Sequence, residues 1–518
     1  MHSIGIIISI VLIWVKIKML ANIAIVVSLV LIIQVVSIKK HLLHHKLQTD
    51  REGGGARQGF FTSKQHHFNK SNYDTFEMRI WVDDTHFDYD CNNKDNGCAV
   101  FLMMGGEGTA NAPGGHMVNL AEEFGALAVS IEHRFYGSSI IDNPNGGKFS
   151  NEHLTLLSVE QAMMDAARFI SSFSTEHPSY KLEEPDTGRT KWITFGGSYS
   201  GELSAWMRVK FPSIVYGAVA SSAPISAIAD YWGYDIIILD ALKNELVGGS
   251  EACGAAVVAA FKTLADLLEN NVKQVISDFA ICEDTLDDMD KRELLDFVSD
   301  DFMGVVQYNN VNDEEKSIAV TCKHMIQSDS TPYDNLVTLT NARNTQDCLS
   351  VSYNETLVET CAEDYAGRAW LFQMCADGSG HDQTCVESEG CPFIEKYATY
   401  EMFLQFCHDC FGVGGDDVSN TGATVEDALL ENYINFGGNN TRGFPSNIIF
   451  VNGNFDPFSW GGVNANSTAA LEKDVVAFVA DGGSHCQDMN ALSDNDTESM
   501  KQVKEGKRLF LKKFLAKK

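Results

Sequence analysis

Three side chains in the sequence have the types needed for nucleophilic catalysis at a carbonyl group: a serine, an aspartate and a histidine. Ser198 lies in a run of small residues, Asp456 lies just before a proline, and His485 lies in a glycine-bearing loop. A serine hydroxyl is a weak nucleophile at neutral pH, so the histidine must take its proton during attack and return it to the leaving group. The aspartate would hold the imidazole in the right tautomer and stabilise the imidazolium that forms. The predicted reaction is acyl transfer to water through a serine ester, which requires no metal and no organic cofactor.

The stretch around Ser198 predicts the sharp turn that exposes such a nucleophile. Trp192 to Phe195 is β-prone, Gly196 to Gly201 is made mostly of small residues, and Glu202 to Lys210 has helix-forming composition. A serine at the point where a strand gives way to a helix is typical of the nucleophile elbow of an α/β-hydrolase. A turn rich in glycine and serine is weak evidence by itself, so the prediction depends on partners elsewhere in the chain.

Two serines in this turn compete for the role of nucleophile. An elbow needs small residues two positions before and two positions after the nucleophile. Ser198 has Gly196 before it and Ser200 after it. A turn centred on Ser200 would instead place Glu202 where a small residue is needed. Ser198 is therefore the predicted nucleophile and Ser200 its rival.

A second glycine-rich turn predicts donors for the negative oxygen of the tetrahedral intermediate. Ala99 to Met104 is a continuous apolar run, typical of a buried strand, and Gly105 to Gly108 follows it. In an α/β-hydrolase a turn at this place supplies one oxyanion donor, and the residue after the nucleophile supplies the other. The predicted donors are the backbone N–H groups of Tyr199 and of Gly106 or Glu107.

The remaining strand-like runs set the order of the catalytic groups. Asp456 follows the run Ile448 to Val451, and His485 follows the run Val475 to Val479, so the order along the chain is Ser, Asp, His, each after a strand. Strands and helices alternate before these, which predicts a mostly parallel sheet with helices on both faces. Further predicted elements are strands at Phe76 to Val82, Ala126 to Ile131 and Val215 to Ala220, a capped helix opening at Ser158, and a C-terminal helix from Glu498 to Leu515.

The fold class is therefore α/β, an α/β-hydrolase with a large helical, disulfide-stapled lid inserted into it. The segment 226–435 is rich in helix formers, cysteine and acidic residues, and it has few β-prone runs. The predicted domains are 1–38 signal peptide or signal anchor, 39–59 flexible linker, 60–225 first part of the hydrolase domain, 226–435 helical lid, and 436–518 second part of the hydrolase domain.

The N-terminus predicts export from the cytosol. Met19 to Ile38 is mostly apolar and about 20 residues long, which suits a signal-peptide core, and cleavage near Ser37 is favoured. The same length spans a bilayer, so an uncleaved signal anchor is the alternative, and only that alternative implies contact with a membrane. The linker histidines, and His66 and His67 beyond it, are interpreted as solvated side chains rather than metal ligands.

The thirteen cysteines fit an oxidising compartment, where disulfides persist. Cys91 and Cys98 are predicted to close a polar loop on themselves. Cys407 and Cys410 form a single Cys-x-x-Cys pattern with no second one to complete a zinc site, so structural disulfides are preferred. Because thirteen is odd, at least one thiol is unpaired or intermolecular, and Cys486 is the candidate.

Charge and glycosylation signals agree with this location. A formal net charge of −31 argues against binding to nucleic acid, which needs a basic surface. Asn-x-Ser/Thr sequences, which could carry glycans in the secretory pathway, occur at Asn69, Asn354, Asn439, Asn466 and Asn495.

Six motifs, in this order, resemble the serine carboxypeptidase family that includes lysosomal Pro-Xaa carboxypeptidase, dipeptidyl peptidase II and thymus-specific serine protease. They are Gly105-Gly106-Glu107-Gly108, Glu132-His133-Arg134-Phe135-Tyr136-Gly137, Gly196-Gly197-Ser198-Tyr199-Ser200-Gly201, Arg368-x-Trp370-x-x-Gln373-x-Cys375, Asn452-Gly453-x-x-Asp456-Pro457 and Ser484-His485-Cys486. The resemblance implies an exopeptidase for short peptides, often beside proline, with a helical cap over the site, in lysosomes or vacuoles or outside the cell. The segment after Cys375 departs from the family pattern, as Asp377-Gly378-Ser379-Gly380 and an insertion to Cys391. The family includes enzymes that read either end of a peptide.

Two other functions remain alternatives on the same fold. An esterase or lipase would share the three catalytic side chains but present an apolar pocket, and the acidic, cysteine-rich lid argues against it. A catalytically silent binding protein would be expected to lack one of Ser198, Asp456 or His485, and all three are present. The expected partner is a peptide substrate, with no nucleic acid, and a homodimer is left open.

Overall fold

The computed structural model describes residues 55–516, apart from 145, 227, 311–312, 314, 381, 414–423, 437–445 and 465–473. Within these residues one eight-stranded sheet has the order β1-β2-β4-β3-β5-β6-β7-β8. The pairs β1–β2 and β2–β4 are antiparallel, and the other neighbours are parallel. The strands are β1 Arg57–Lys64, β2 Thr75–Asp83, β3 Cys98–Met103, β4 Leu127–Ile131, β5 Thr190–Gly197, β6 Gly217–Ser221, β7 Ile448–Gly453 and β8 Val475–Ala480.

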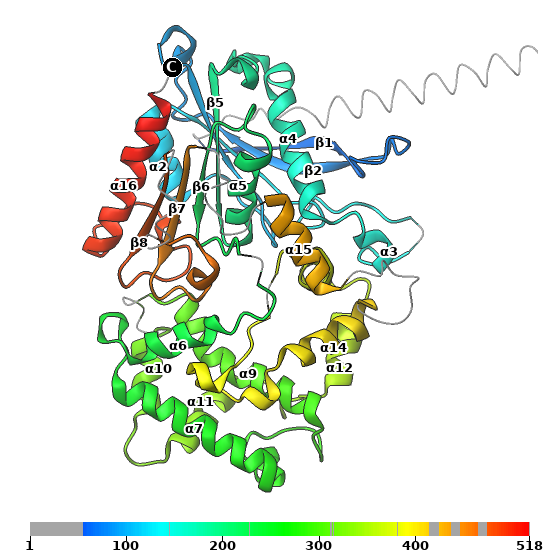
Figure 1. Cartoon of the computed structure of the whole chain (residues 1–518), viewed down its shortest axis with the longest axis vertical. Helices are drawn as coiled ribbons and strands as arrows, with labels where there is room; N and C mark the ends of the chain where they lie inside the picture. Colours follow the sequence, from blue (N-terminus) through cyan, green and yellow to red (C-terminus); the bar gives the residue numbers. More distant parts are fainter. Residues whose placement is uncertain are drawn as a thin grey trace, which may run out of the picture.

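Helices cover both faces of this sheet, as the parallel strands require. Alternate side chains of a strand point to opposite faces, so Val100 and Leu102 of β3 pack with helices α4 (Val159–Glu176) and α5 (Tyr199–Lys210). Ala99 and Phe101 pack on the other face, with α2 (Gly115–Phe124) and α16 (Glu498–Leu515). Figure 1 shows these two helical layers on either side of the strands. The strands, the alternation and the C-terminal helix agree with the prediction of an α/β-hydrolase.

Between β6 and β7 the chain forms the predicted helical insertion. Figure 1 shows most of its helices gathered below the sheet. A buried apolar core of its own, with Phe261 and Phe302 among its largest side chains, holds the first part of it together. Its helices are α6 Gly233–Lys243, α7 Glu251–Asn270, α8 Val272–Asp278, α9 Asp288–Gln307, α10 Ile318–Met325, α11 Pro332–Arg343, α12 Tyr353–Thr360, α13 Arg368–Phe372, α14 Tyr400–Phe411 and α15 Val425–Phe436, and the short helix α3 (Asn151–Leu154) precedes α4 outside it.

Disulfides brace the insertion. The predicted pair Cys91–Cys98 forms, and Cys486 is the free cysteine among the described residues. Cys407 and Cys410 are both in disulfides, each with a partner earlier in the insertion, so they do not form half of a zinc or redox site. The pairs within the insertion are Cys253–Cys322, Cys282–Cys348, Cys361–Cys410, Cys375–Cys407 and Cys385–Cys391.

Two predictions near the N-terminus are wrong. Strand β1 was not predicted, and it begins at Arg57, inside the segment 39–59 that was expected to be a flexible linker. Its Phe61 and Ser63 are buried against the sheet, which fixes the strand. His67, interpreted as solvated, has a side chain that is 1% exposed, and its Nε2 lies 2.7 Å from Asp165. That buried carboxylate was not visible in the local sequence.

The predicted signal segment 1–38 lies outside the described residues. Among the residues that the structure does describe, no helix has the length and apolar character needed to cross a bilayer. Of the predicted glycosylation sites, Asn69, Asn354 and Asn495 are exposed. Asn439 and Asn466 lie outside the described residues.

Candidate active site

Ser198 occupies a strained turn at the end of β5, where α5 begins. Its backbone has φ 57° and ψ −133°, a conformation that costs about 1–3 kcal/mol for a residue with a side chain and persists only when the surroundings impose it. Its N–H donates to the carbonyl oxygen of Ser221 on β6, at 2.9 Å. A Cβ atom on Gly196 would lie 1.9 Å from the carbonyl oxygen of Ser200, so this position tolerates glycine alone. The turn is thus the elbow that the small residues predicted.

The rival serine is occupied within the same turn. The Ser200 hydroxyl donates to the carbonyl oxygen of Gly197 and accepts from the Gly197 N–H, both at 2.9 Å. Ser200 is also buried, whereas Ser198 is partly exposed. Ser200 therefore closes the turn, and its hydroxyl is not presented to solvent.

Asp456 and His485 come together after the last two strands, as predicted. The His485 ring nitrogen Nδ1 lies 2.9 Å from Asp456 Oδ1, and the same oxygen accepts the Phe458 N–H at 3.0 Å. Asp456 is fully buried and His485 is 7% exposed. Burial alone would lower the pKa of His485, but the negative charge of Asp456 and the sulfur of Cys486 outweigh it and raise that pKa well above its ordinary value. The carboxylate thus favours a charged imidazole in a buried place.

The loop that carries His485 lies against the elbow. A Cβ atom on Gly197 would lie 2.7 Å from Cys486 Sγ, so the residue after His485 touches the residue before Ser198. The Cys486 N–H donates to the Ser222 hydroxyl at 2.8 Å, which fixes the loop to the end of β6. The described contacts therefore bring the two segments side by side, although they come from opposite ends of the hydrolase fold.

A cavity of about 310 Å³ opens at Ser198. Two of its walls come from residues that contact the His485 ring: Phe458, with ring centres 4.9 Å apart, and Tyr308, with ring centres 6.0 Å apart. Tyr308 follows helix α9 of the insertion. The other lining residues are Glu107, Tyr199, Glu202, Pro224, Gln307, Trp370, Met374, Ser379 and Gln383, so the insertion forms a large part of the wall.

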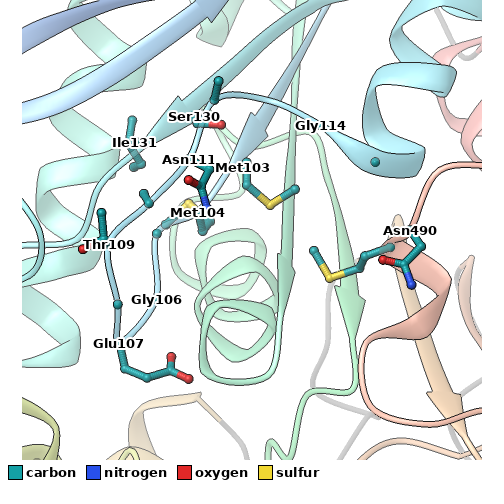
Figure 2. A pocket seen from close by; sticks show the side chains of 16 residues that line it. Met103, Met104, Gly106, Glu107, Thr109, Asn111, Gly114, Ser130, Ile131 and Asn490 are labelled. Carbon is teal, nitrogen blue, oxygen red and sulfur yellow. The ribbon is translucent and has the colours of Figure 1, made fainter. Parts of the chain in front are cut away.

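The backbone segments predicted to supply oxyanion donors lie beside the elbow. Tyr199 is the first residue of α5, and no side chain caps that end of the helix. The first N–H groups of a helix have no partner inside the helix, and the helix dipole favours negative charge there. On the other side, the loop after β3 passes close to the elbow, because a Cβ atom on Gly106 would lie 3.3 Å from Ser200 Cβ. Figure 2 shows Glu107 at the tip of this loop, with its carboxylate directed away from Ser130, Asn111 and Met103.

The Glu-His-Arg-Phe-Tyr-Gly motif after β4 supports this loop rather than reacting. Glu132 is fully buried and accepts the N–H of Ala110 at 3.1 Å and the N–H of Ser138 at 2.8 Å. Arg134, also fully buried, makes two hydrogen bonds to Asp165, at 2.7 and 2.8 Å. The motif therefore fixes the position of the glycine-rich turn relative to the sheet.

Tyr199 and Ser379, which line the cavity, are held by hydrogen bonds to other buried polar side chains. The pKa of His133 is lowered to about 4 by burial, so this histidine is neutral. Its Nδ1 donates to the Arg134 carbonyl oxygen at 2.7 Å, which leaves Nε2 to accept the Tyr199 hydroxyl at 3.0 Å. Gln373 Nε2 donates to the Ser379 hydroxyl at 3.1 Å, and that hydroxyl donates to Asp377 at 3.0 Å.

Glu202 is a component that the sequence analysis missed. It was considered only as a residue too large for an alternative turn. Its side chain lines the cavity, the residue is 2% exposed, and its Oε2 has no hydrogen-bond partner among the described residues. Burial raises the pKa of Glu202 well above its ordinary value, and the charges of Glu107 and Asp377 raise it further. A buried acid in a helix whose other residues are mostly apolar or small was the available signal.

One further cluster resembles a metal site by composition. Asp235, Cys385 and Cys391 place one ligand atom each within 4.8 Å of one another. Because Cys385 and Cys391 are joined in a disulfide, neither can offer a thiolate. The cluster therefore does not fit a metal ion.

Comparison with known proteins gives agreeing matches. A family model described as "Serine carboxypeptidase S28" matches residues 63–506. Thymus-specific serine protease of Mus musculus is 32% identical over 469 residues, which cover 87% of this chain and 86% of that protein. Lysosomal Pro-X carboxypeptidase of Bos taurus is 25% identical over 479 residues, which cover 88% of this chain and 87% of that protein.

Proposed function

Because the chain belongs to the serine carboxypeptidase S28 family, and is therefore a serine peptidase, we propose that Ser198 is its nucleophile, His485 its general base and Asp456 the group that orients the base. The observation that carries this assignment is the pairing of a strained, partly exposed serine with a buried Asp–His pair whose loop touches the elbow. The substrate is a peptide, and the enzyme is an exopeptidase.

The first half of the reaction forms an ester. His485 Nε2 accepts the proton of the Ser198 hydroxyl while Oγ attacks the scissile carbonyl carbon. The tetrahedral oxyanion is held by the N–H of Tyr199 and by the N–H of Gly106 or Glu107. Such a donor contributes about 10²- to 10³-fold to turnover. The imidazolium then gives its proton to the leaving nitrogen, and the C–N bond breaks.

The second half returns the enzyme to its starting state. Water takes the place of the leaving amine, His485 accepts one of its protons, and the resulting hydroxide attacks the ester carbonyl. Collapse of the second tetrahedral intermediate breaks the bond to Ser198 Oγ, which regains its proton from His485. Throughout, the Asp456 carboxylate stabilises the charged imidazole. Every proton and electron pair is accounted for by these residues and water.

Labelling with a fluorophosphonate tests the nucleophile. We expect the wild-type protein and Ser200→Ala to be labelled at Ser198, and Ser198→Ala to remain unlabelled. Loss of labelling in Ser200→Ala alone, in protein that is still folded by its thermal transition, would show that the nucleophile has been misassigned. Absence of labelling in folded wild-type protein would support the silent binding protein instead.

A substrate panel separates the peptidase from an esterase and tests the preference for proline. Short peptides with proline or alanine next to the scissile bond are compared with fatty-acid esters of the same chromophore. The carboxylates in the wall of the cavity support peptides, since an apolar acyl chain would leave Glu202 buried without a partner. Faster turnover of the fatty esters than of every peptide would support the esterase.

We further propose that the protein follows the secretory route to a lysosomal or extracellular location. The disulfides need an oxidising compartment for their formation. Exposed Asn69, Asn354 and Asn495 are accessible to glycosylation. Enzymatic removal of N-linked glycans from protein made in animal cells should lower its apparent mass, and no change would contradict this route.

A further inference from the structure

Among the described residues, the side chains that line the cavity at Ser198 include two carboxylic acids and no Lys, Arg or His. The two acids are Glu107 and Glu202. Glu202 is more than nine-tenths buried, and its Oε2 meets no donor among the described residues. A buried acceptor without a partner is unfavourable, more so when it is charged, so it needs a ligand or a proton. A cationic group of the substrate would satisfy it.

A second acidic cavity, of about 320 Å³, adjoins the first. Gln307, Tyr308 and Gln383 line both. Asp235, Asp296, Asp300 and Asp382 line the second cavity, and Arg292 is the one cationic side chain among the described residues that line it. Arg292 is already paired with Asp382 at 3.2 Å and with Asp296 at 3.7 Å. Within the part of the chain that the structure describes, neither cavity therefore offers an unpaired cation to a substrate carboxylate.

The mechanism assigns a side to each half of the substrate. His485 protonates the leaving amine, so the leaving half lies on the side of His485 and Tyr308, next to the second cavity. A free C-terminal carboxylate there would find both nearby guanidinium groups already paired, Arg292 with Asp296 and Asp382, and Arg343 with Asp300. The acyl half lies on the side of the oxyanion donors, where Glu107 and Glu202 stand. The charges thus disfavour a carboxyl end on one side and favour an amino end on the other.

The position of Glu202 sets the length of the acyl half. Glu202 is the fourth residue of α5 and follows Ser198, which precedes the helix, by four positions, a rise of about 6 Å along the helix axis. Two extended residues span at most about 7 Å, whereas the ammonium group of a single residue is bonded to the carbon next to the scissile carbonyl and would stop short. This separation of the two backbone positions is comparable to the reach of a two-residue acyl group.

We propose that Glu202, with Glu107, binds the free ammonium group of a peptide, so that the enzyme removes dipeptides from the amino end rather than single residues from the carboxyl end. This inference rests on the proposed function of Ser198. Glu202 makes the direct ion pair, and Glu107 adds negative charge at the mouth of the cavity. Trp370, Met374 and Ser379 contribute to the wall of the same cavity.

Matched substrates test whether the enzyme recognises the amino end or the carboxyl end of a peptide. They also test whether it requires a terminal ammonium group or accepts the ammonium group of a lysine side chain. Ala-Ala-, Ala-, acetyl-Ala-Ala- and acetyl-Lys-coumarylamides are compared at pH 7.5, together with a tetra-alanine peptide carrying either a free or an amidated C-terminus. We expect kcat/KM for Ala-Ala-coumarylamide to exceed that of the acetylated form about 10- to 100-fold, the value of a charge-assisted hydrogen bond. Amidation of the C-terminus should change little. A large loss on amidation, or acetyl-Lys turned over as fast as Ala-Ala, would overturn the proposal.

Variants assign the effect to Glu202. We expect Glu202→Gln to reduce the ratio between free and acetylated Ala-Ala to near one, mainly by raising KM for the free amine. Glu122→Gln, an exposed acid on α2, is the matched control and should keep the wild-type ratio. An equal loss on both substrates in Glu202→Gln would mean a structural role.

Binding to Ser198→Ala keeps this test independent of catalysis. Calorimetry with Ala-Ala-Ala-Ala and with its acetylated form should give at least tenfold tighter binding of the free amine, and the difference should vanish in Ser198→Ala/Glu202→Gln. Equal binding of both peptides would overturn the ammonium site. If the free amine binds more tightly to this variant but wild-type protein hydrolyses neither peptide, the site is upheld and the proposed catalytic function fails instead.

Discussion

Replacing Asp456 by asparagine should isolate the contribution of its charge. Asp456 Oδ1 contacts His485 Nδ1 and accepts the Phe458 N–H, whereas Oδ2 is buried and has no partner among the residues that the structure describes. An asparagine can therefore place its side-chain carbonyl oxygen at the Oδ1 position and its amide nitrogen at the Oδ2 position. The tautomer of His485 is preserved, and what is lost is the negative charge beside the imidazolium.

The size of the loss follows from the distance between the two groups. At 2.9 Å and an effective dielectric constant of about 20, the attraction between imidazolium and carboxylate is about 5.7 kcal/mol. The neutral amide oxygen still contributes a hydrogen bond of about 1 kcal/mol. The expected decrease in kcat is thus about 10³- to 10⁴-fold, with little change in KM, because the charge acts when the imidazolium forms.

The same variant should shift the pH profile. His485 must be neutral to act as base, and its raised pKa places the acidic limb of kcat/KM above about 6.5 in the wild-type enzyme. Without the Asp456 charge this pKa falls, so the limb moves to lower pH. The assay is hydrolysis of a fluorogenic dipeptide from pH 4 to 9, with the exposed Asp494→Asn as control. A loss below tenfold, or an unmoved limb, would refute the assignment of Asp456.

Three further predictions concern stability and the thiol. Cys486 should be the single cysteine alkylated in the native protein, and its alkylation should slow fluorophosphonate labelling of Ser198, because its sulfur lies against the elbow. Mass spectrometry counts the alkyl adducts, and zero adducts or several adducts per chain would contradict this prediction. Asp165→Asn should destabilise the fold by about 3–5 kcal/mol in denaturant, since it leaves the buried Arg134 guanidinium uncompensated, and a change below about 1 kcal/mol would count against it. The pKa of Glu202 is raised in the folded state, so above pH 4.5 the folded state binds more protons than the unfolded state, and stability falls as pH rises towards the folded pKa. Glu202→Gln should therefore have a higher melting temperature than wild type at pH 8 and the same melting temperature at pH 4. A lower melting temperature of the variant at pH 8 would contradict the burial of this charge.

The parts of the fold that the sequence predicted are those set by short-range patterns. The strand before Ser198, the turn and the helix after it are specified by neighbouring residues. The positions of Asp456 and His485 follow from the rule that catalytic groups stand after strands of a parallel sheet. The C-terminal helix has the predicted bounds, Glu498 to Leu515, because its apolar spacing and capping residue are local.

Other features depend on contacts between distant segments. Tyr308 and Trp370 line the cavity although they are 110 and 172 positions from Ser198 in the chain, and no local pattern reports such a meeting. The pairing of Cys407 with Cys375 is one of many combinations that the cysteines allow. His67 was misinterpreted because its partner, Asp165, lies in a helix 98 residues away.

The insertion is joined directly to the loop that carries His485, the proposed general base. The backbone N–H of His485 donates to the carbonyl oxygen of Gln307, at the end of α9, at 2.9 Å. The Ser484 hydroxyl donates to the carbonyl oxygen of Asn309 at 3.0 Å. Movement of the insertion away from the sheet would break these hydrogen bonds or displace the His485 imidazole from Asp456. If His485 is the general base, as proposed, the hydrogen bonds that hold it beside Asp456 also fix the insertion in place, and long or folded polypeptides are expected to be excluded.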